Sequence, residues 1–267
     1  MVPETGMREE GARRWGGTWR WLLPFLLLAL LIGAWQLAAS TGAIAEALNL
    51  EDFLVPSPAE IASSLWENRG LLAENAWVTL REMLLGLLCA LVVGLGFAAL
   101  MHRWEVLRNA AYPLVVASQT IPIVVVAPIL VVWFGYGIAP KVVIVALICF
   151  FPLTVSSLDG LRSVDPEALK LMRSLDASRW QRFRRVEVPA ALPSVFTGAK
   201  IAVVLAPIGA VFGEWVGSSS GLGHLILTDN GQLEVAREFA AVVLLSAMAL
   251  ALMGLTALAE RRVVTWR

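Results

Sequence analysis

Long apolar runs separated by short polar segments dominate this chain of 267 residues. A bilayer core is crossed by about 20 mostly apolar residues in helical form. Runs of that kind predict six membrane-spanning helices, at residues 21–40, 80–101, 111–135, 139–158, 195–216 and 238–260. Prolines inside several runs are compatible with this, because neighbouring helices or water can satisfy the freed carbonyl groups. The pattern predicts an all-helical integral membrane protein with six spans.

Composition supports the membrane class. Hydrophobic residues make up 58% of the chain and charged residues 16%, with a mean hydropathy of +0.73. These values lie outside the range of soluble domains. The first run is longer than a signal-peptide core, so we expect it to be retained as a span. Cys89 and Cys149 lie in apolar runs and are expected to be core residues. His102 and His224 have no cysteine or carboxylate cluster nearby, so we expect no metal site. A nucleic-acid partner is not expected either.

The basic residues are distributed unevenly between the two sides of the predicted bundle. With the N-terminus inside, the cytoplasmic segments hold Arg8, Arg13, Arg14, Arg20, Arg103, Arg108, the cluster at 162–185, Arg261, Arg262 and Arg267. The outer side then holds Arg69, Arg81, Lys141 and Arg237. Because cytoplasmic loops are enriched in Lys and Arg, both termini are predicted to be cytoplasmic. The organisation is then a tail at 1–20, a six-span domain at 21–260 with a cytoplasmic segment at 159–194, and a tail at 261–267.

Three helix starts can be read from capping patterns. Ser57, Pro58 and Glu60 predict a short outer helix over about 58–68. Asp165-Pro166 predicts a helix over about 166–175, and Ser178 with Gln181 predicts one over about 179–188. We expect a break at Asp176-Ala177, Pro189 as the end of the second of these helices, and Pro193 as the start of the fifth span.

The stretch "SRWQRFRR" at 178–185 differs from its apolar surroundings. Arg179, Arg182, Arg184 and Arg185 surround Trp180 and Phe183, which are three residues apart and share one side of a helix. Two interpretations fit this composition. The arginines could meet anionic lipid headgroups at the membrane surface, or the aromatic pair could be the anchor of a protein interface with a cationic rim.

Several stretches resemble permease subunits of ATP-binding-cassette importers with the type I fold. The insert "KLMRSLDAS…VPAALP" resembles the cytoplasmic coupling segment of that family, with Asp176 at the position of the family's glycine. Further similarity lies in "VPSPAEI", "QTIPIVVVAPILVVWFGYGIAPKVVIV", "FFPLTVSSLDGLRSVDPE" and "GAVFGEWVGSSSGLGHLI". It covers about residues 53–260 and is strongest with the branch that serves nitrate, sulfonates, taurine and thiamine-precursor pyrimidines. Because Asp tolerates the left-handed conformation, the turn at Asp176 is expected to persist.

The resemblance implies a transport subunit, not an enzyme, in a bacterial plasma membrane, working by alternating access. The partners it implies are a cytosolic ATPase, an extracytoplasmic binding protein and a second copy of the chain. Each of the three lysines, Lys141, Lys170 and Lys200, lacks the preceding glycine of a P-loop, so ATP and Mg²⁺ are expected in the partner and no cofactor in this chain. The implied ATPase-coupling residues are Asp176, Ala177, Ser178, Arg179, Trp180, Arg182, Phe183, Pro189 and Pro193. A thiamine-precursor pyrimidine is the favoured substrate, with nitrate, sulfonate, taurine or a riboflavin-like ring as alternatives.

Other patterns add candidate sites. Intramembrane polar residues usually face a cavity or bundle interior, so Ser118, Gln119, Thr120 and Glu214 are candidates for a translocation path. Glu214 could instead meet Arg81 or a binding protein. Gly209, Gly213 and Gly217 form a stripe for close helix packing, within one subunit or across a dimer. Lys200 is expected to extend to the cytoplasmic interface. "GSSSG" at 217–221 predicts a flexible outer turn.

Two other functional classes compete with the importer. A channel or secondary transporter without an ATPase would leave the basic aromatic insert unexplained. "GSSSG" also matches a nucleophile-elbow pattern, so a membrane serine hydrolase using Ser219 is a further alternative.

Overall fold

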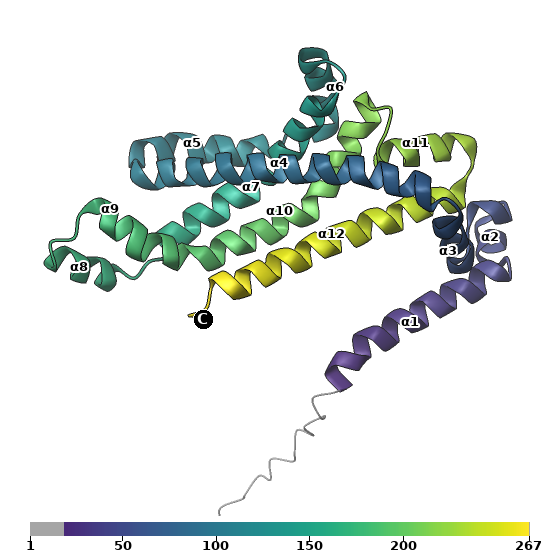
Figure 1. The fold of residues 1–267 in the computed structure, drawn as a ribbon, viewed down its shortest axis with the longest axis horizontal. Helices are drawn as coiled ribbons and strands as arrows, with labels where there is room; N and C mark the ends of the chain where they lie inside the picture. Colours follow the sequence, from purple (N-terminus) through teal and green to yellow (C-terminus); the bar gives the residue numbers. More distant parts are fainter. Residues whose placement is uncertain (1–18, 267) are drawn as a thin grey trace, which may run out of the picture. The chain divides into compact units, whose positions relative to one another are not determined.

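The structure is a computed structural model that describes residues 19–266, which form helices and connecting loops without a strand in that range (Figure 1). Residues 1–18 and Arg267 lie outside the described residues, and with them most of the predicted N-terminal tail. The chain divides into two compact units at Glu60 and Ile61, and each is described by itself.

The N-terminal unit contains the predicted first span and the start of the predicted outer helix. Helix α1 covers Trp19–Ser40, followed by the short helix α2 (Ala43–Leu48) and the 3-10 helix η1 (Asp52–Leu54). The capping box at the start of α3 (Pro58–Glu67) is formed as predicted. Glu60 Oε2 accepts from the Ser57 N–H at 2.7 Å, and Ser57 Oγ accepts from the Glu60 N–H at 3.3 Å. This local pattern fixes the start of α3.

Four long helices of the second unit lie side by side (Figure 1): α4 (Arg69–Arg103), α7 (Ile138–Arg162), α10 (Val188–Gly217) and α12 (Val235–Val263). Helix α7 packs along both α4 and α10. Small side chains in the core let the backbones approach closely. The largest core cluster is Met83, Ala90, Val145, Cys149, Leu153, Ala202, Ala206 and Ala210. Cys149 is buried as predicted, whereas Cys89 is exposed, which corrects its assignment to the core.

The predicted third span is broken. Its residues form α5 (Glu105–Ser118) and α6 (Ile123–Phe134), two helices bent by 100° at the connection between them. The span predicted over 111–135 therefore corresponds to a bent pair of helices and not to one continuous helix. Proline at 122 supplies no N–H and disfavours a helical conformation at Ile121, which accounts for the break. The other five predicted spans correspond to single helices long and apolar enough to cross a membrane.

The two ends of the bundle differ in character. Helices α8 (Pro166–Ser174) and α9 (Arg179–Arg182) lie at one end, and α11 (Leu222–Gln232), which the sequence pattern did not predict, lies at the other (Figure 1). Helix α11 is joined to α12 by an ion pair between Asp229 and Arg237 at 2.7 Å. Lys200 of α10 pairs with Glu260 of α12. The expectation that Lys200 extends to the cytoplasmic interface stays a prediction.

Candidate functional site

The predicted coupling segment folds through the caps that the sequence indicates. Asp165 Oδ1 accepts from the Glu167 N–H at 2.9 Å at the start of α8. Ser178 and Gln181 form a complete capping box at the start of α9. These contacts satisfy N–H groups that have no partner inside the helix.

The turn between α8 and α9 keeps its geometry without glycine. Asp176 has a φ of 51°, in the left-handed region. Its N–H donates to the Arg173 carbonyl at 3.1 Å, and the Ala177 N–H donates to the Met172 carbonyl at 3.0 Å. These are the two hydrogen bonds of a Schellman motif, which ends a helix at a left-handed residue. The expectation that aspartate can hold this turn is confirmed.

The second predicted helix of the segment does not end at Pro189. Helix α9 continues through a π-helical turn, η2 (Phe183–Glu187), directly into α10. Together they form one 39-residue helix, Arg179–Gly217. Pro189 lies in the first turn of α10 and Pro193 lies inside it, so neither proline separates the segment from the fifth span. The π-turn changes the hydrogen-bond register just before Pro189, which makes the missing N–H of that residue tolerable.

Trp180 and Phe183 form a stacked aromatic pair but differ in exposure. Their ring centroids are 5.8 Å apart with an interplanar angle of 28°. Trp180 is 66% exposed. Phe183 is partly buried and lies 6.4 Å from the ring of His102, near the end of α4. His102 Nε2 in turn lies 3.0 Å from Glu187 Oε2. Phe183 therefore fixes the segment to α4, while Trp180 presents its ring outward.

A groove with a volume of ≈ 650 Å³ lies beside the aromatic pair. Its lining combines aromatic and basic side chains with Glu187: His102, Arg103, Arg173, Arg179, Trp180, Arg182 and Phe183. The Arg182 Nε atom is buried and has no hydrogen-bond partner among the described residues. The groove is thus a cationic surface with an exposed aromatic ring at its edge.

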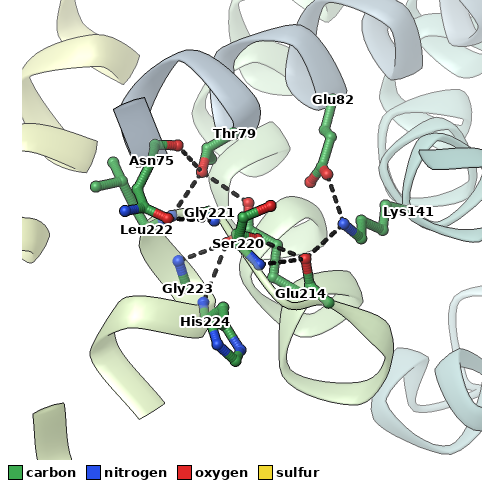
Figure 2. A network of polar contacts seen from close by, with 11 residues as sticks. Asn75, Thr79, Glu82, Lys141, Glu214, Ser220, Gly221, Leu222, Gly223 and His224 are labelled. Carbon is green, nitrogen blue, oxygen red and sulfur yellow. Dashed lines mark hydrogen bonds and ion pairs between the residues drawn. The ribbon is translucent and has the colours of Figure 1, made fainter. Parts of the chain in front are cut away.

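A buried polar network lies where α4, α7 and the end of α10 meet (Figure 2). Lys141 Nζ donates to Glu82 Oε1 at 2.8 Å and to Ser218 Oγ at 2.6 Å. Lys141 is 5% exposed and Glu82 is 1% exposed. Lys141 was predicted only as one of the outer basic residues. Its burial could not be read from the sequence, because Glu82 and Ser218 are 59 and 77 residues away.

Glu214 is fully buried in the same region and fixes the start of α11. Its carboxylate accepts from Thr79 Oγ1 at 2.6 Å and from the N–H groups of Gly223 at 2.5 Å and His224 at 3.2 Å. These contacts, not one with Arg81, satisfy the side chain. The structure therefore positions Glu214 as a link between α4 and α11, away from Ser118 and Gln119.

The loop at 217–221 is held by side chains of α4 (Figure 2). The Gly221 N–H donates to Asn75 Oδ1 at 2.7 Å, and the Leu222 N–H donates to Thr79 Oγ1 at 2.8 Å. Gly221 has a φ of 112°, and a Cβ there would overlap the Glu214 carboxylate. Hydrogen bonds to α4 hold this loop in place, which corrects the prediction of a flexible outer turn. In the described part of the chain no hydrogen bond joins Ser219 to His224.

The glycine stripe packs inside the chain. A Cβ at Gly209 would lie 2.8 Å from the Val145 Cα, and one at Gly213 would lie 3.1 Å from the Lys141 Cα, both on α7. A Cβ at Gly217 would lie 2.7 Å from Val131 Cγ2 on α6. Of the two alternatives left open by the sequence, contact within one subunit is the one observed.

Ser118, Gln119 and Thr120 lie at the break between α5 and α6. Ser118 and Gln119 line a cavity of ≈ 680 Å³ together with residues of α4, α6 and α7. Thr120 is not among the lining residues, and its hydroxyl donates to the Ala117 carbonyl at 2.7 Å. The structure thus brings two of the four predicted path residues to one cavity. Within the described residues no group of three His, Cys, Asp or Glu side chains could hold a metal ion.

The helical bundle, its apolar spans and its basic end define a multi-pass membrane protein. Residues 84–265 match the family described as the binding-protein-dependent transport system inner membrane component. The chain belongs to this family. A probable ABC transporter permease protein of Haemophilus influenzae is 40% identical over 87% of this chain and 93% of its own length. A formylaminopyrimidine transport permease protein of Halalkalibacterium halodurans is 36% identical over 92% of this chain and 96% of its own length.

Two further comparisons extend this result. A riboflavin transport system permease protein of Chloroflexus aurantiacus is 37% identical over 91% of this chain and 89% of its own length. An inward-facing structure of a methionine ABC transporter, at 20% identity, matches with a TM-score of 0.65 over 74% of this chain and 98% of that chain. The type I permease fold is confirmed. The chain is a transport subunit of an ABC importer for small solutes in the inner membrane, not an enzyme, and the family implies an ATPase partner and a binding protein.

Proposed function

We propose that α9 and its aromatic pair form the docking site for the cytosolic ATPase that drives this permease. The observation that carries the proposal is the exposed Trp180 ring, which stacks on Phe183 beside a groove rich in arginine. An aromatic anchor with a guanidinium rim is typical of protein interfaces.

ATP and Mg²⁺ bind to the partner, and two copies of this chain form the transmembrane pathway. Both termini and the α8–α9 end face the cytoplasm, and the binding protein docks at the opposite end.

The continuous helix from Arg179 to Gly217 supports a mechanical role for this segment. A displacement at Trp180 would be lost in a flexible loop. A helix passes the displacement along its axis, because its backbone hydrogen bonds resist bending. Movement of the docked ATPases would therefore reach α10 directly. Alternating access follows when α10 and the helices packed on it tilt together.

We infer that a thiamine-precursor pyrimidine is the substrate. The support is the 36% identity to the formylaminopyrimidine permease over nearly the whole of both chains. The riboflavin permease, at 37% identity, makes a riboflavin-like ring the main alternative. Nitrate, sulfonate and taurine are weaker alternatives, since the aliphatic sulfonate and taurine permeases are each 26% identical.

The docking proposal is tested with Trp180→Ala. Loss of an interface anchor typically costs at least about 2 kcal/mol of binding, so co-purification of the ATPase and substrate-stimulated ATP hydrolysis should fall sharply. Membrane levels should stay normal, because the exposed Trp180 ring contributes little to the bundle core. A double variant with Phe183→Ala should be at least as impaired.

The matched control is Trp133→Ala, since Trp133 is 74% exposed on α6, outside the coupling segment. It should retain the ATPase. A lipid-anchoring role for Trp180 would instead lower the membrane level while leaving the ATPase bound. Full ATPase binding and uptake in both Trp180 variants would refute the docking role.

A further inference from the structure

The cavity at the α5–α6 break is lined mainly by apolar side chains. Its volume is ≈ 680 Å³, and the described residues around it include no charged side chain. Phe97 of α4 and Phe150 of α7 both line it, with ring centroids 5.9 Å apart. Most of the remaining lining is aliphatic, so a ligand would meet mainly apolar and aromatic surface.

Gln119 supplies the polar group of this cavity that is free to bind a ligand. Its side chain is exposed and has no hydrogen-bond partner among the described residues. The Ser118 hydroxyl, by contrast, already donates to the Val115 carbonyl at 2.7 Å. A primary amide offers an N–H donor and a carbonyl acceptor side by side. It can therefore pair with a ligand edge that carries an acceptor next to a donor.

We propose that this cavity is a ring-binding site for an uncharged nitrogen heteroaromatic compound. The Gln119 amide would bind the edge of the ring, and Phe97 and Phe150 would pack against its face. Aromatic packing favours flat rings, and a polar edge without a partner would be costly in so apolar a lining. This inference rests on the proposed importer function and gives the proposed pyrimidine substrate a binding site in the chain.

The same lining argues against anionic substrates at this site. A sulfonate or nitrate would lose its hydration with no cationic side chain to replace it, which is strongly unfavourable in an apolar environment. The groove at the coupling end has the opposite character, since four arginines line it. The cavity and the groove therefore differ in the charge of the ligand that each can bind. The uncharged cavity at the α5–α6 break suits neutral rings, and the arginine-rich groove suits an acidic partner.

The test is a ligand-detected NMR titration of the full chain in lipid nanodiscs, with 4-amino-2-methylpyrimidine as the ring probe and taurine as the charged probe. Wild type should bind the ring and not taurine. Gln119→Leu should weaken ring binding by about tenfold. The leucine side chain cannot form the hydrogen bonds that the amide gives the ring, and their net loss typically raises the dissociation constant by about this factor. Gln119→Glu, which keeps the shape but lacks the amide donor, should also weaken it.

The matched control is Thr120→Val, at the adjacent position that does not line the cavity, which should bind like wild type. Wild-type affinity for the ring in both Gln119 variants would overturn the site, as would binding of taurine in competition with the ring. These outcomes are separate from failure of the importer function. That failure would appear as wild-type chain that does not co-purify with an ATPase, whatever the ring binds.

Discussion

The ion pair between Lys141 and Glu82 places two opposite charges inside the helical bundle, at the wall of a pocket of ≈ 680 Å³. Both side chains are almost fully buried, and Ser218 gives the ammonium group a second acceptor. One carboxylate oxygen of Glu82 has no hydrogen-bond partner among the described residues. Burying such a pair is costly, and its worth depends on both partners being present. The pair therefore specifies how α4, α7 and the loop after α10 fit together.

Removing one partner of this pair should be far more damaging than removing both. We expect Lys141→Met to destabilise the chain by about 3–5 kcal/mol, because it leaves Glu82 buried without a counter-charge. Adding Glu82→Gln should recover much of that loss. The measurement is the thermal unfolding midpoint of the purified chain in detergent, followed by tryptophan fluorescence.

The control for this experiment is the surface pair of Lys170 and Glu167, whose side chains are 68% and 74% exposed. Lys170→Met should change stability by at most about 1 kcal/mol, as exposed pairs contribute little. A double variant at Glu82 and Lys141 that is no more stable than Lys141→Met would contradict this account.

At the scale of the elements, close helix packing depends on glycine where backbones meet. Gly213 of α10 faces the backbone of Lys141 on α7, in the same region as the ion pair. A Cβ added at Gly254 of α12 would lie in open space. The two residues are therefore chemically identical but differ in what an added side chain would meet.

Gly213→Leu should lower the stability of the chain and the yield of assembled transporter. An added side chain would press on Lys141, and overpacking commonly costs about 1–3 kcal/mol. Gly254→Leu is the matched control and should be tolerated, because no atom lies within 4 Å of its Cβ position. Unfolding midpoints and the yield of the complex measure the effect. Equal stability of the two variants would show that α10 and α7 do not approach closely at Gly213.

The elements also show which features a sequence can predict. The caps at Ser57, Asp165 and Ser178 were predictable because each depends on residues three or fewer positions apart. The break at the α5–α6 connection was missed because hydropathy stays high on both sides of Pro122, so length alone suggested one span. The helix α11 was missed because its start depends on Glu214 and Asn75, which are brought there by tertiary packing.

For the candidate sites the same distinction holds. The aromatic pair in the coupling segment is local and was recognised, but its continuity with α10 was not, since prolines at 189 and 193 suggested interruptions. Most of the polar network could not be predicted, because the contacts that join side chains of α4 and α7 to their partners in it connect residues 59 to 146 positions apart along the chain. Gln119 was identified as an intramembrane polar residue, whereas the cavity beside it required the bend.

At the scale of the whole permease unit, one helix connects the α8–α9 end of the bundle with the buried polar network. The α9–η2–α10 helix of 39 residues would be about 58 Å long at the standard rise per residue. Its first turn carries Trp180 and Arg179, and its last residue, Gly217, enters the loop held by Asn75 and Lys141. We therefore expect the continuous α9–η2–α10 helix to carry a displacement from the basic end to the buried polar network.

The final prediction concerns the orientation of this unit in the membrane. Because basic residues gather at the α8–α9 end, that end should be cytoplasmic, and α11 should be outside. Cysteines are introduced singly at Gln232, Lys170 and Arg262, in a background without Cys89 and Cys149. Gln232 at the end of α11 is exposed, so Gln232→Cys should react in whole cells with a membrane-impermeant maleimide. Lys170→Cys and Arg262→Cys should react only after the cells are permeabilised, which also shows that both sites are accessible. Labelling of Lys170→Cys in intact cells would place the coupling segment outside and would exclude its contact with a cytosolic ATPase.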